Sequence, residues 1–255
     1  MKVTFMGSGT SMGVPTIGCE CVVCSSSDPK NKRTRPSLLI QTGDSNLLID
    51  TAVDFRMQAI RENLKRVDAV LYTHSHADHI LGLDDLRPFN YWQKMHIPCF
   101  GNASTMENIC QTFRYVFSDP QPGGSIPRIE PHVIDGPFDF RGIRIIPIPV
   151  LHGKMPVFGY RIGGLSYLTD LSEIPETSYS QLKGTSTLIL GVLRYEPHPT
   201  HLYLEKALEI INRVQPERSF FTHLSHDFDH ERTNAELPES VRLSYDGFSF
   251  EMDEP

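Results

Sequence analysis

Short runs of apolar and β-branched residues alternate with turn signals along the chain, and these runs predict strands. In the first half we expect strands at residues 3–6, 37–41, 46–50 and 69–72. The second and third of these runs flank Thr42-Gly43-Asp44-Ser45, which is typical of a hairpin turn. Apolar residues recur at helical spacing around residues 55–64, which predicts a helix before the fourth strand.

The second half of the chain repeats this alternation. Strands are predicted at residues 143–150, 159–162, 165–169, 188–191 and 219–222, with a helix near 202–214 that Pro216 ends. Asp246-Gly247 separates two further runs, 241–245 and 248–250, and favours a closing hairpin. Residues 119–131 are rich in proline and glycine, which predicts a loop. Two β-rich halves with helices predict an α+β fold, a β-sandwich between helical layers.

Length and composition favour one ordinary globular domain over residues 1–255. The chain has 39% hydrophobic and 22% charged residues, which excludes disordered, collagen-like and coiled-coil proteins. A domain of this size buries roughly 70–75% of its unfolded surface, so it needs no disulfides for stability. No run approaches the ~20 apolar residues of a membrane span, and the start of the chain lacks the apolar core of a signal peptide. We therefore expect a cytoplasmic protein with no membrane partner.

The net charge narrows the class of partner. Twenty-four basic and 31 acidic residues give a formal charge of −7. Proteins that depend on many phosphate contacts are usually basic or carry a basic stripe, so a long nucleic acid is not the expected partner. Arg33 and Arg35 lie in a short basic cluster before a predicted strand. They could contact a substrate phosphate, although a solvated basic face is the simpler interpretation.

The segment His74-Ser75-His76-Ala77-Asp78-His79 carries the most specific chemistry in the chain. It directly follows a predicted strand. His74 and His76 are two residues apart in extended chain, project to the same side and can share one metal ion. Asp78 and His79 follow where the chain turns and can serve a second ion. Imidazole and carboxylate ligands suit zinc, manganese or iron and do not choose among them.

Two ions need more ligands than this motif offers. His152, Asp170 and His223 each follow a predicted strand and are the candidates for the remaining positions. Asp50 also ends a predicted strand; it either orients a ligand histidine or caps the following turn. Two nearby ions activate water and clamp a phosphoryl oxygen, so we expect attack by a metal-bound hydroxide without a serine or cysteine nucleophile.

Three of the five cysteines, Cys19, Cys21 and Cys24, lie within six residues. In a reducing compartment a C-x-C-x-x-C cluster indicates metal ligation before disulfide formation, and the alternative is three cysteines that bind nothing. Cys99 and Cys110 are expected to be ordinary buried residues.

With these motifs the sequence resembles the metallo-β-lactamase superfamily of metallohydrolases. The resemblance runs through the glycine-rich start, Leu48-Ile49-Asp50-Thr51, the histidine motif and the three strand-end ligands. It implies an αββα sandwich of two mixed β-sheets flanked by helices, with two divalent ions between the sheet edges. One ion would be held by His74, His76 and His152, and the other by Asp78, His79 and His223. Asp170 would bridge them, and Asp78 would also be catalytic.

A narrower resemblance is to the PhnP-type phosphodiesterases, which act on cyclic ribose phosphates. It rests on the cysteine cluster together with His223-Leu224-Ser225-His226. It implies a structural zinc ion held by Cys19, Cys21, Cys24 and His226, and a closed Cys₃His set suits such an ion. It also implies that His201 is the general acid, with a solvent-facing histidine at a helix start as the alternative and His198 as the weaker rival.

The expected function is therefore hydrolysis of a small cyclic or nucleotide-like phosphodiester by a dinuclear enzyme. The alternatives are an RNA 3′-processing nuclease of the same superfamily and a non-catalytic zinc-dependent binding module. A binding module would have no use for the complete ligand set. A di-iron redox enzyme is disfavoured, because such relatives usually have glutamate where His76 stands. The sequence is compatible with a homodimer.

Overall fold

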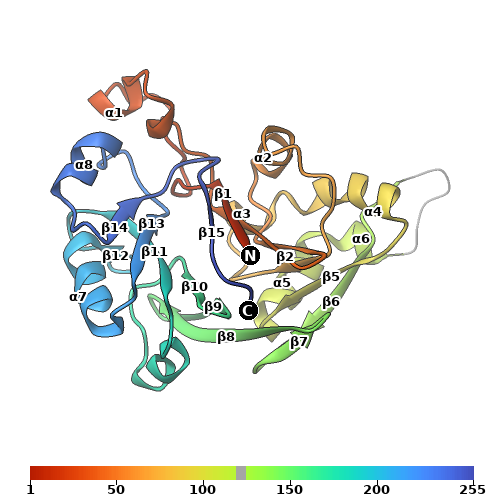
Figure 1. Cartoon of the computed structure of the whole chain (residues 1–255). Coiled ribbons are helices and arrows are strands. Elements are labelled where there is room, and N and C mark those ends of the chain that lie inside the picture. Colours follow the sequence, from red (N-terminus) through yellow and green to blue (C-terminus); the bar gives the residue numbers. More distant parts are fainter. Residues whose placement is uncertain (119–124) are drawn as a thin grey trace.

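The chain folds into two β-sheets that pack face to face, with helices on both outer faces (Figure 1). The computed structural model describes residues 1–118 and 125–255. In that part the first sheet has seven strands in the order β15-β1-β2-β3-β4-β5-β6. The second has eight strands, in the order β14-β13-β11-β10-β9-β8-β7 with β12 beside β11. Both sheets contain parallel and antiparallel pairs, which confirms the predicted αββα sandwich.

The strands of the first sheet are β1 (Lys2–Gly7), β2 (Ser37–Thr42), β3 (Ser45–Ile49), β4 (Ala69–Leu71), β5 (Ile97–Gly101), β6 (Ile129–Val133) and β15 (Ser249–Glu251). Those of the second are β7 (Phe138–Phe140), β8 (Ile143–His152), β9 (Met155–Ile162), β10 (Leu165–Leu168), β11 (Thr187–Arg194), β12 (Leu202–Tyr203), β13 (Arg218–Thr222) and β14 (Val241–Leu243). The helices are α1 (Val22–Ser25), α2 (Phe55–Arg61), α3 (Ala77–Ile80), α4 (Arg87–Gln93), α5 (Ala103–Thr112), α6 (Arg114–Phe117), α7 (Leu204–Val214) and α8 (His230–Glu236). Short 3-10 helices span Pro29–Asn31, Leu83–Leu86 and Glu176–Leu182.

Three apolar clusters fill the spaces between these layers. The central cluster joins inward-facing residues of both sheets, among them Phe5, Tyr160 and Phe220. A second cluster lies under the helices of the first sheet, and a third lies under α7 and α8 on the second sheet. Central strands such as β4 and β11 are buried on both faces, so their sequences are nearly continuous apolar runs.

The predicted closing hairpin is wrong. β14 pairs with β13 in the second sheet, whereas β15 pairs with β1 in the first. The physical reason is packing: Val241 belongs to the outer cluster beneath the helices, while Phe248 and Phe250 pack on the central cluster between the sheets. The Asp246-Gly247 turn therefore carries the chain from one sheet to the other.

Two further boundaries differ from the sequence prediction. The predicted loop 119–131 gives way to β6 at Ile129; residues 119–124 lie outside the described residues. Pro131 is tolerated because β6 is the edge strand of its sheet. The predicted helix 202–214 begins two residues late, since Leu202 and Tyr203 first pair with β11 as β12. Among the helices that the structure describes, none has the length and apolar character needed to cross a membrane.

Candidate metal centre

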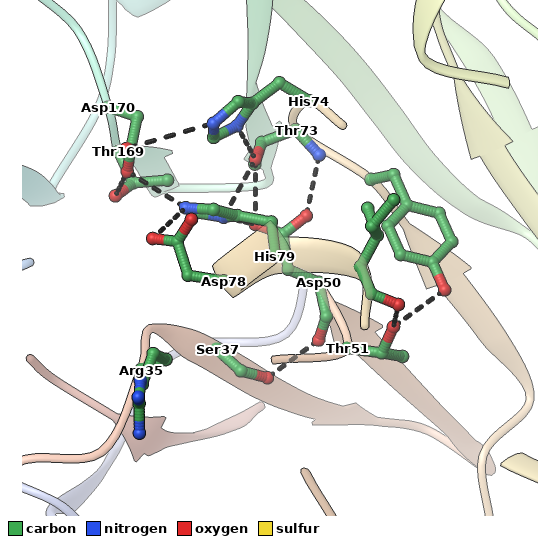
Figure 2. A network of polar contacts seen from close by, with 12 residues as sticks. Arg35, Ser37, Asp50, Thr51, Thr73, His74, Asp78, His79, Thr169 and Asp170 are labelled. Atoms are coloured by element: carbon green, nitrogen blue, oxygen red, sulfur yellow. Dashed lines mark hydrogen bonds and ion pairs between the residues drawn. The ribbon is translucent and has the colours of Figure 1, made fainter. Parts of the chain in front are cut away.

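The histidine motif lies where β4 ends and α3 begins. β4 is a completely buried strand in the middle of its sheet. Beyond its carboxyl end, the side chains of His74 and His79 project toward Asp170 (Figure 2). His76 is the N-cap of α3, and Asp78 and His79 occupy its first turn. This change from extended chain to helix directs the two halves of the motif to neighbouring positions, as the spacing predicts.

The other three candidates come from the second sheet. His152 ends β8, Asp170 follows β10 and His223 follows β13. Asp170 and His223 adopt left-handed backbone conformations, with φ of 50° and 58°. Non-glycine residues rarely adopt such values, and they concentrate at functional sites. The chain therefore turns sharply at each of these strand ends and presents the side chain between the sheets.

The structure brings the seven residues together as two overlapping groups. His74, His76, His152 and Asp170 form one group, and Asp78, His79, His223 and Asp170 form the other. In each group the candidate ligand atoms lie within 4.8 Å of one another. Asp170 belongs to both groups, which is the position that the resemblance implies for a bridging ligand.

Unpartnered buried atoms show that these residues fit metal ions. Among the described residues, the Nε2 atoms of His74, His79 and His223 and the Oδ2 atom of Asp78 are buried without a hydrogen bond. A buried polar atom without a partner costs about 1–3 kcal/mol. All four atoms belong to the two groups, so divalent ions held there would satisfy them together.

Asp50 controls the orientation of two of the ligands. Its carboxylate accepts hydrogen bonds from the Thr73 amide and hydroxyl, both at 2.8 Å, and lies 2.7 Å from His79 Nδ1. An ionised carboxylate only accepts, so His79 Nδ1 carries the proton and Nε2 is free for a metal. The single hydroxyl proton of Thr73 goes to Asp50, so at 3.0 Å the hydroxyl must accept from His74 Nδ1. Figure 2 shows this network.

A backbone carbonyl does the same for His152. Its Nδ1 lies 2.7 Å from the carbonyl oxygen of Thr200, so Nδ1 donates and Nε2 faces the centre. Neither Thr73 nor Thr200 was identified from the sequence. For Thr73, its position next to a ligand histidine is only a weak signal. Thr200 acts through its main-chain carbonyl oxygen, which every residue type has, so the sequence cannot indicate it.

The charges at the centre favour cation binding. Burial lowers the pKa of His223, but the carboxylates of Asp170 and Asp78 outweigh it and raise the pKa to about 9. Burial also lowers the pKa of His79, and its three carboxylate neighbours raise it well above the ordinary value. These two histidines therefore hold protons at neutral pH in the metal-free chain, and ions must displace them.

His201 lies beside the centre but outside both groups. Its Nδ1 is 4.0 Å from Asp170 Oδ2, and its ring lies 4.9 Å from the His223 ring and 4.6 Å from the His152 ring. It precedes β12 and its side chain is only 15% exposed, so the alternative of a solvent-facing residue at a helix start is wrong. Burial, with His223 next, lowers the pKa of His201 to about 3, so its ring is neutral at pH 7.

The three clustered cysteines converge on His226. The Sγ atoms of Cys19, Cys21 and Cys24 lie 3.2, 3.6 and 3.4 Å from His226 Nδ1. Hydrogen bonds to Cys21, first from the Cys24 amide, lower its pKa to about 7, which favours the thiolate that metals bind. The four residues form a third group that could hold a metal ion, as expected for a closed Cys₃His set.

Arg33 has a different role from either sequence interpretation. It is 2% exposed, so it neither faces solvent nor contacts a substrate. Its guanidinium donates to the carbonyl oxygens of Ser225 at 2.9 Å and Phe228 at 2.7 Å. It thus holds the backbone between His223 and α8, and burial lowers its pKa to about 10. Arg35 is partly exposed and pairs with Asp54 at 3.2 Å.

The glycine-rich start of the chain runs alongside the same segment. Gly9 pairs with Leu224, and the Leu224 amide donates to the Ser8 carbonyl at 2.9 Å. A Cβ atom on Gly9 would lie 2.8 Å from the Arg33 carbonyl oxygen, so only glycine allows this close approach. The loop that follows β1 is thereby packed against the His223 segment.

Comparisons with known proteins support the family and the fold. Residues 45–224 match the family model described as "Beta-lactamase superfamily domain". The crystal structure of a new diphosphatase from the PhnP family superimposes with a TM-score of 0.93 at 43% identity, covering 99% of this chain and 98% of that one.

Two curated relatives with different names are also similar in sequence to this chain. An octanoyltransferase of Porphyromonas gingivalis is 37% identical over 100% of this chain and 52% of its own length, so the chain spans about half of that protein. A ribonuclease Z of Methanopyrus kandleri is 26% identical over 83% of this chain and 88% of its own length. The family model and the 43% identical structure identify the chain as a member of the metallo-β-lactamase superfamily, close to the PhnP family.

Proposed function

We propose that this metallohydrolase is a dinuclear phosphodiesterase that acts on a small cyclic or nucleotide-like phosphodiester. The observation that carries the proposal is the pair of ligand groups that share Asp170, beside a histidine that could protonate a leaving group. Two divalent ions, with zinc or manganese the expected metals and iron a further option, would activate water and clamp a phosphoryl oxygen. The Cys₃His group would hold one structural zinc ion.

The remaining chemistry belongs to the protein's own side chains. Asp50, Thr73 and the Thr200 carbonyl fix the tautomers of three ligands, so their Nε2 atoms face the centre. Asp78 is expected to act both as a ligand and as a hydrogen-bond acceptor at the reacting face. Burial raises its pKa, but His79 and His223 outweigh this and lower the pKa far below the ordinary value, which keeps it ionised.

His201 is proposed as the general acid. Its pKa of about 3 in the free protein means that it must gain its proton when an anionic substrate arrives. A phosphate next to the ring favours the imidazolium form and raises the pKa. The acid would then be charged only in the complex, where the leaving oxygen needs a proton.

The 43% identical diphosphatase favours a second candidate, the hydrolysis of a phosphoric anhydride. The reactions differ in the leaving group, because a phosphate is a much weaker base than an alkoxide. An alkoxide leaving group requires a proton from a general acid, whereas a phosphate leaving group depends on one far less. Ribonuclease Z activity is a weaker candidate, because the chain carries a net charge of −7.

The test is turnover of bis(p-nitrophenyl) phosphate by zinc- or manganese-loaded protein. We expect hydrolysis by the wild type and a loss of at least about a hundredfold in Asp78→Ala, since ligand and acceptor are removed together. His201→Ala should lose little on this substrate, whose leaving group is weakly basic, and about a hundredfold on 2′,3′-cyclic adenosine phosphate.

Protein that holds two ions at the catalytic groups and hydrolyses neither substrate would contradict the phosphodiesterase proposal. Faster cleavage of diadenosine diphosphate than of either ester, with little effect of His201→Ala, would favour the anhydride candidate instead.

A further inference from the structure

Asp170 is the ligand that both groups share, and its two carboxylate oxygens face different neighbours. Oδ2 lies 3.2 Å from His223 Nε2 and 3.9 Å from His74 Nε2, so it reaches histidines of both groups. Oδ1 lies 3.3 Å from His79 Nε2, which belongs to one group only. The last torsion of an aspartate side chain has broad minima, so the backbone does not decide which oxygen takes which position. A further contact has to do so.

The preceding residue, Thr169, supplies that contact. It is completely buried, and its hydroxyl donates a hydrogen bond to Asp170 Oδ1 at 2.8 Å (Figure 2). Threonine is branched at Cβ, so its first side-chain torsion is restricted and the hydroxyl is held in place. The bond keeps Oδ1 on the side of Thr169, and Oδ2 therefore faces His74 and His223.

Gly191 on the neighbouring strand β11 leaves the space that this arrangement needs. A Cβ atom on Gly191 would lie 3.0 Å from the amide nitrogen of Asp170 and 3.1 Å from Thr169 Oγ1. Both distances are shorter than ordinary van der Waals contacts. A larger residue would therefore displace either the hydroxyl of Thr169 or the sharp turn of the chain at Asp170, where φ is 50°.

We propose that Thr169, with Gly191 beside it, is a positioning residue of the metal centre: its hydroxyl orients the Asp170 carboxylate so that Oδ2 is presented to both candidate ions. Thr169 acts through Asp170 and does not contact the substrate. This inference rests on the dinuclear centre of the proposed function and not on the choice of phosphodiester. Because Asp170 is shared, a carboxylate that turns away weakens the binding of the pair of ions more than the binding of a single ion.

Thr222 provides a matched comparison within the same chain. It pairs with Gly191 from the other neighbouring strand, is completely buried and directly precedes the ligand His223, as Thr169 precedes Asp170. Among the residues that the structure describes, however, the Thr222 hydroxyl has no hydrogen-bond partner. Replacement of Thr222 by valine therefore makes the same chemical change next to a ligand without removing a bond to that ligand.

The test is a titration of the purified proteins with manganese, in which electron paramagnetic resonance measures the free ion. Manganese suits the histidine and carboxylate groups better than the thiolate-rich Cys₃His group, so the titration reports on the catalytic groups. Thr169→Val should lower the affinity for the second ion about 10- to 100-fold, because the shared ligand loses the partner that orients it. Thr222→Val should bind both ions as the wild type does.

Further variants separate the hydroxyl from the shape of the side chain. Thr169→Ser keeps the hydroxyl and should restore most of the affinity. Gly191→Ala should resemble Thr169→Val, whereas Gly136→Ala should change nothing, since a Cβ atom on Gly136 would have open space around it.

The resonance of the bound ions supplies a second readout that a purely structural role would not change. Magnetic coupling between two manganese ions passes through the ligand that they share. The signal of the coupled pair should therefore weaken in Thr169→Val and persist in Thr222→Val when both proteins are saturated with manganese. Urea unfolding of the metal-free proteins checks that both variants are folded.

Unchanged affinity and an unchanged coupled signal in Thr169→Val would overturn the inference. Equal losses in Thr169→Val and Thr222→Val would do the same, because they would show a general effect of packing beside the ligands. In either case a wild type that binds two ions and hydrolyses a diester leaves the proposed function intact, and only this inference fails. If the wild type does not bind two ions at these groups, the proposed function fails and the inference fails with it.

Discussion

Replacing Asp50 by asparagine tests whether hydrogen bonds outside the ligand set determine metal affinity. Asp50 is completely buried and accepts from Thr73 twice and from His79 once. An asparagine keeps the size but turns one acceptor into an NH₂ donor. Where that donor meets His79 Nδ1–H, the ring must move its proton to Nε2, which is the atom that faces the metal centre. Where it meets the Thr73 hydroxyl, the orientation of His74 is disturbed instead.

The size of the effect can be estimated. Loss of a partner that orients a metal ligand typically lowers affinity by about 10- to 100-fold, which corresponds to about 1.4–2.7 kcal/mol. Replacement of a hydrogen bond to a charged group lowers the free energy of unfolding by about 2 kcal/mol. We therefore expect Asp50→Asn to fold, with a lower unfolding midpoint and a metal affinity reduced at least tenfold.

The assay is competition for zinc with a chromophoric chelator, beside urea unfolding of the metal-free proteins. Asp68→Asn is the matched control, because Asp68 is also a fully buried carboxylate. It pairs with Arg66 and Arg141, each at a distance of 2.6 Å, and lies away from the metal centre. It should lower stability without changing zinc affinity. Equal zinc affinity in Asp50→Asn and wild type, or equal losses in both variants, would refute the argument that Asp50 acts through ligand tautomers.

Three other outcomes are expected. His226→Ala should retain one zinc ion fewer per chain by elemental analysis and unfold at a temperature lower by at least about 5 °C, since a structural ion contributes directly to folding; an unchanged metal content would exclude this site. Arg33→Met should lower the free energy of unfolding by about 3 kcal/mol in urea, because two buried carbonyl groups lose their donor, whereas Arg232→Met on the exposed face of α8 should change it by less than about 0.5 kcal/mol. Filling of the catalytic groups at pH 7 should release about two protons, from His79 and His223, because neighbouring carboxylates raise the pKa of both rings. Affinity should therefore rise with pH at least up to about 9, the pKa of His223. Calorimetry in buffers of different ionisation enthalpy measures this release, and heats independent of the buffer would argue against it.

The sequence predicted those parts of the molecule whose signals are local. The strands that carry the candidate ligands are apolar runs followed within three residues by histidine or aspartate, as after Leu71 and Leu168, so both strand and side chain could be placed. β5 was not predicted, because Pro98 and Gly101 interrupt its pattern although its neighbours protect it. The closing hairpin was wrong for a different reason: a turn sequence indicates that the chain reverses, and only packing decides which sheet each arm joins.

The difference between local signals and features that depend on packing also applies to the metal centre. Residue type and spacing were enough to name the seven residues that the structure gathers, because their chemistry is specific. The Thr200 carbonyl could not be found, since every residue has one. Arg33 was interpreted as a surface residue because of its charge. Its burial depends on carbonyl oxygens from a segment almost two hundred positions later.

The two sheets contribute unequal and separate parts of the candidate centre. The first supplies the His74–His79 motif, and the second supplies His152, Asp170 and His223. Neither sheet alone holds a complete group, so ions can be captured fully only after both sheets have folded and docked. Ions held by these groups would therefore be captured late in folding, and they would fasten the two halves together.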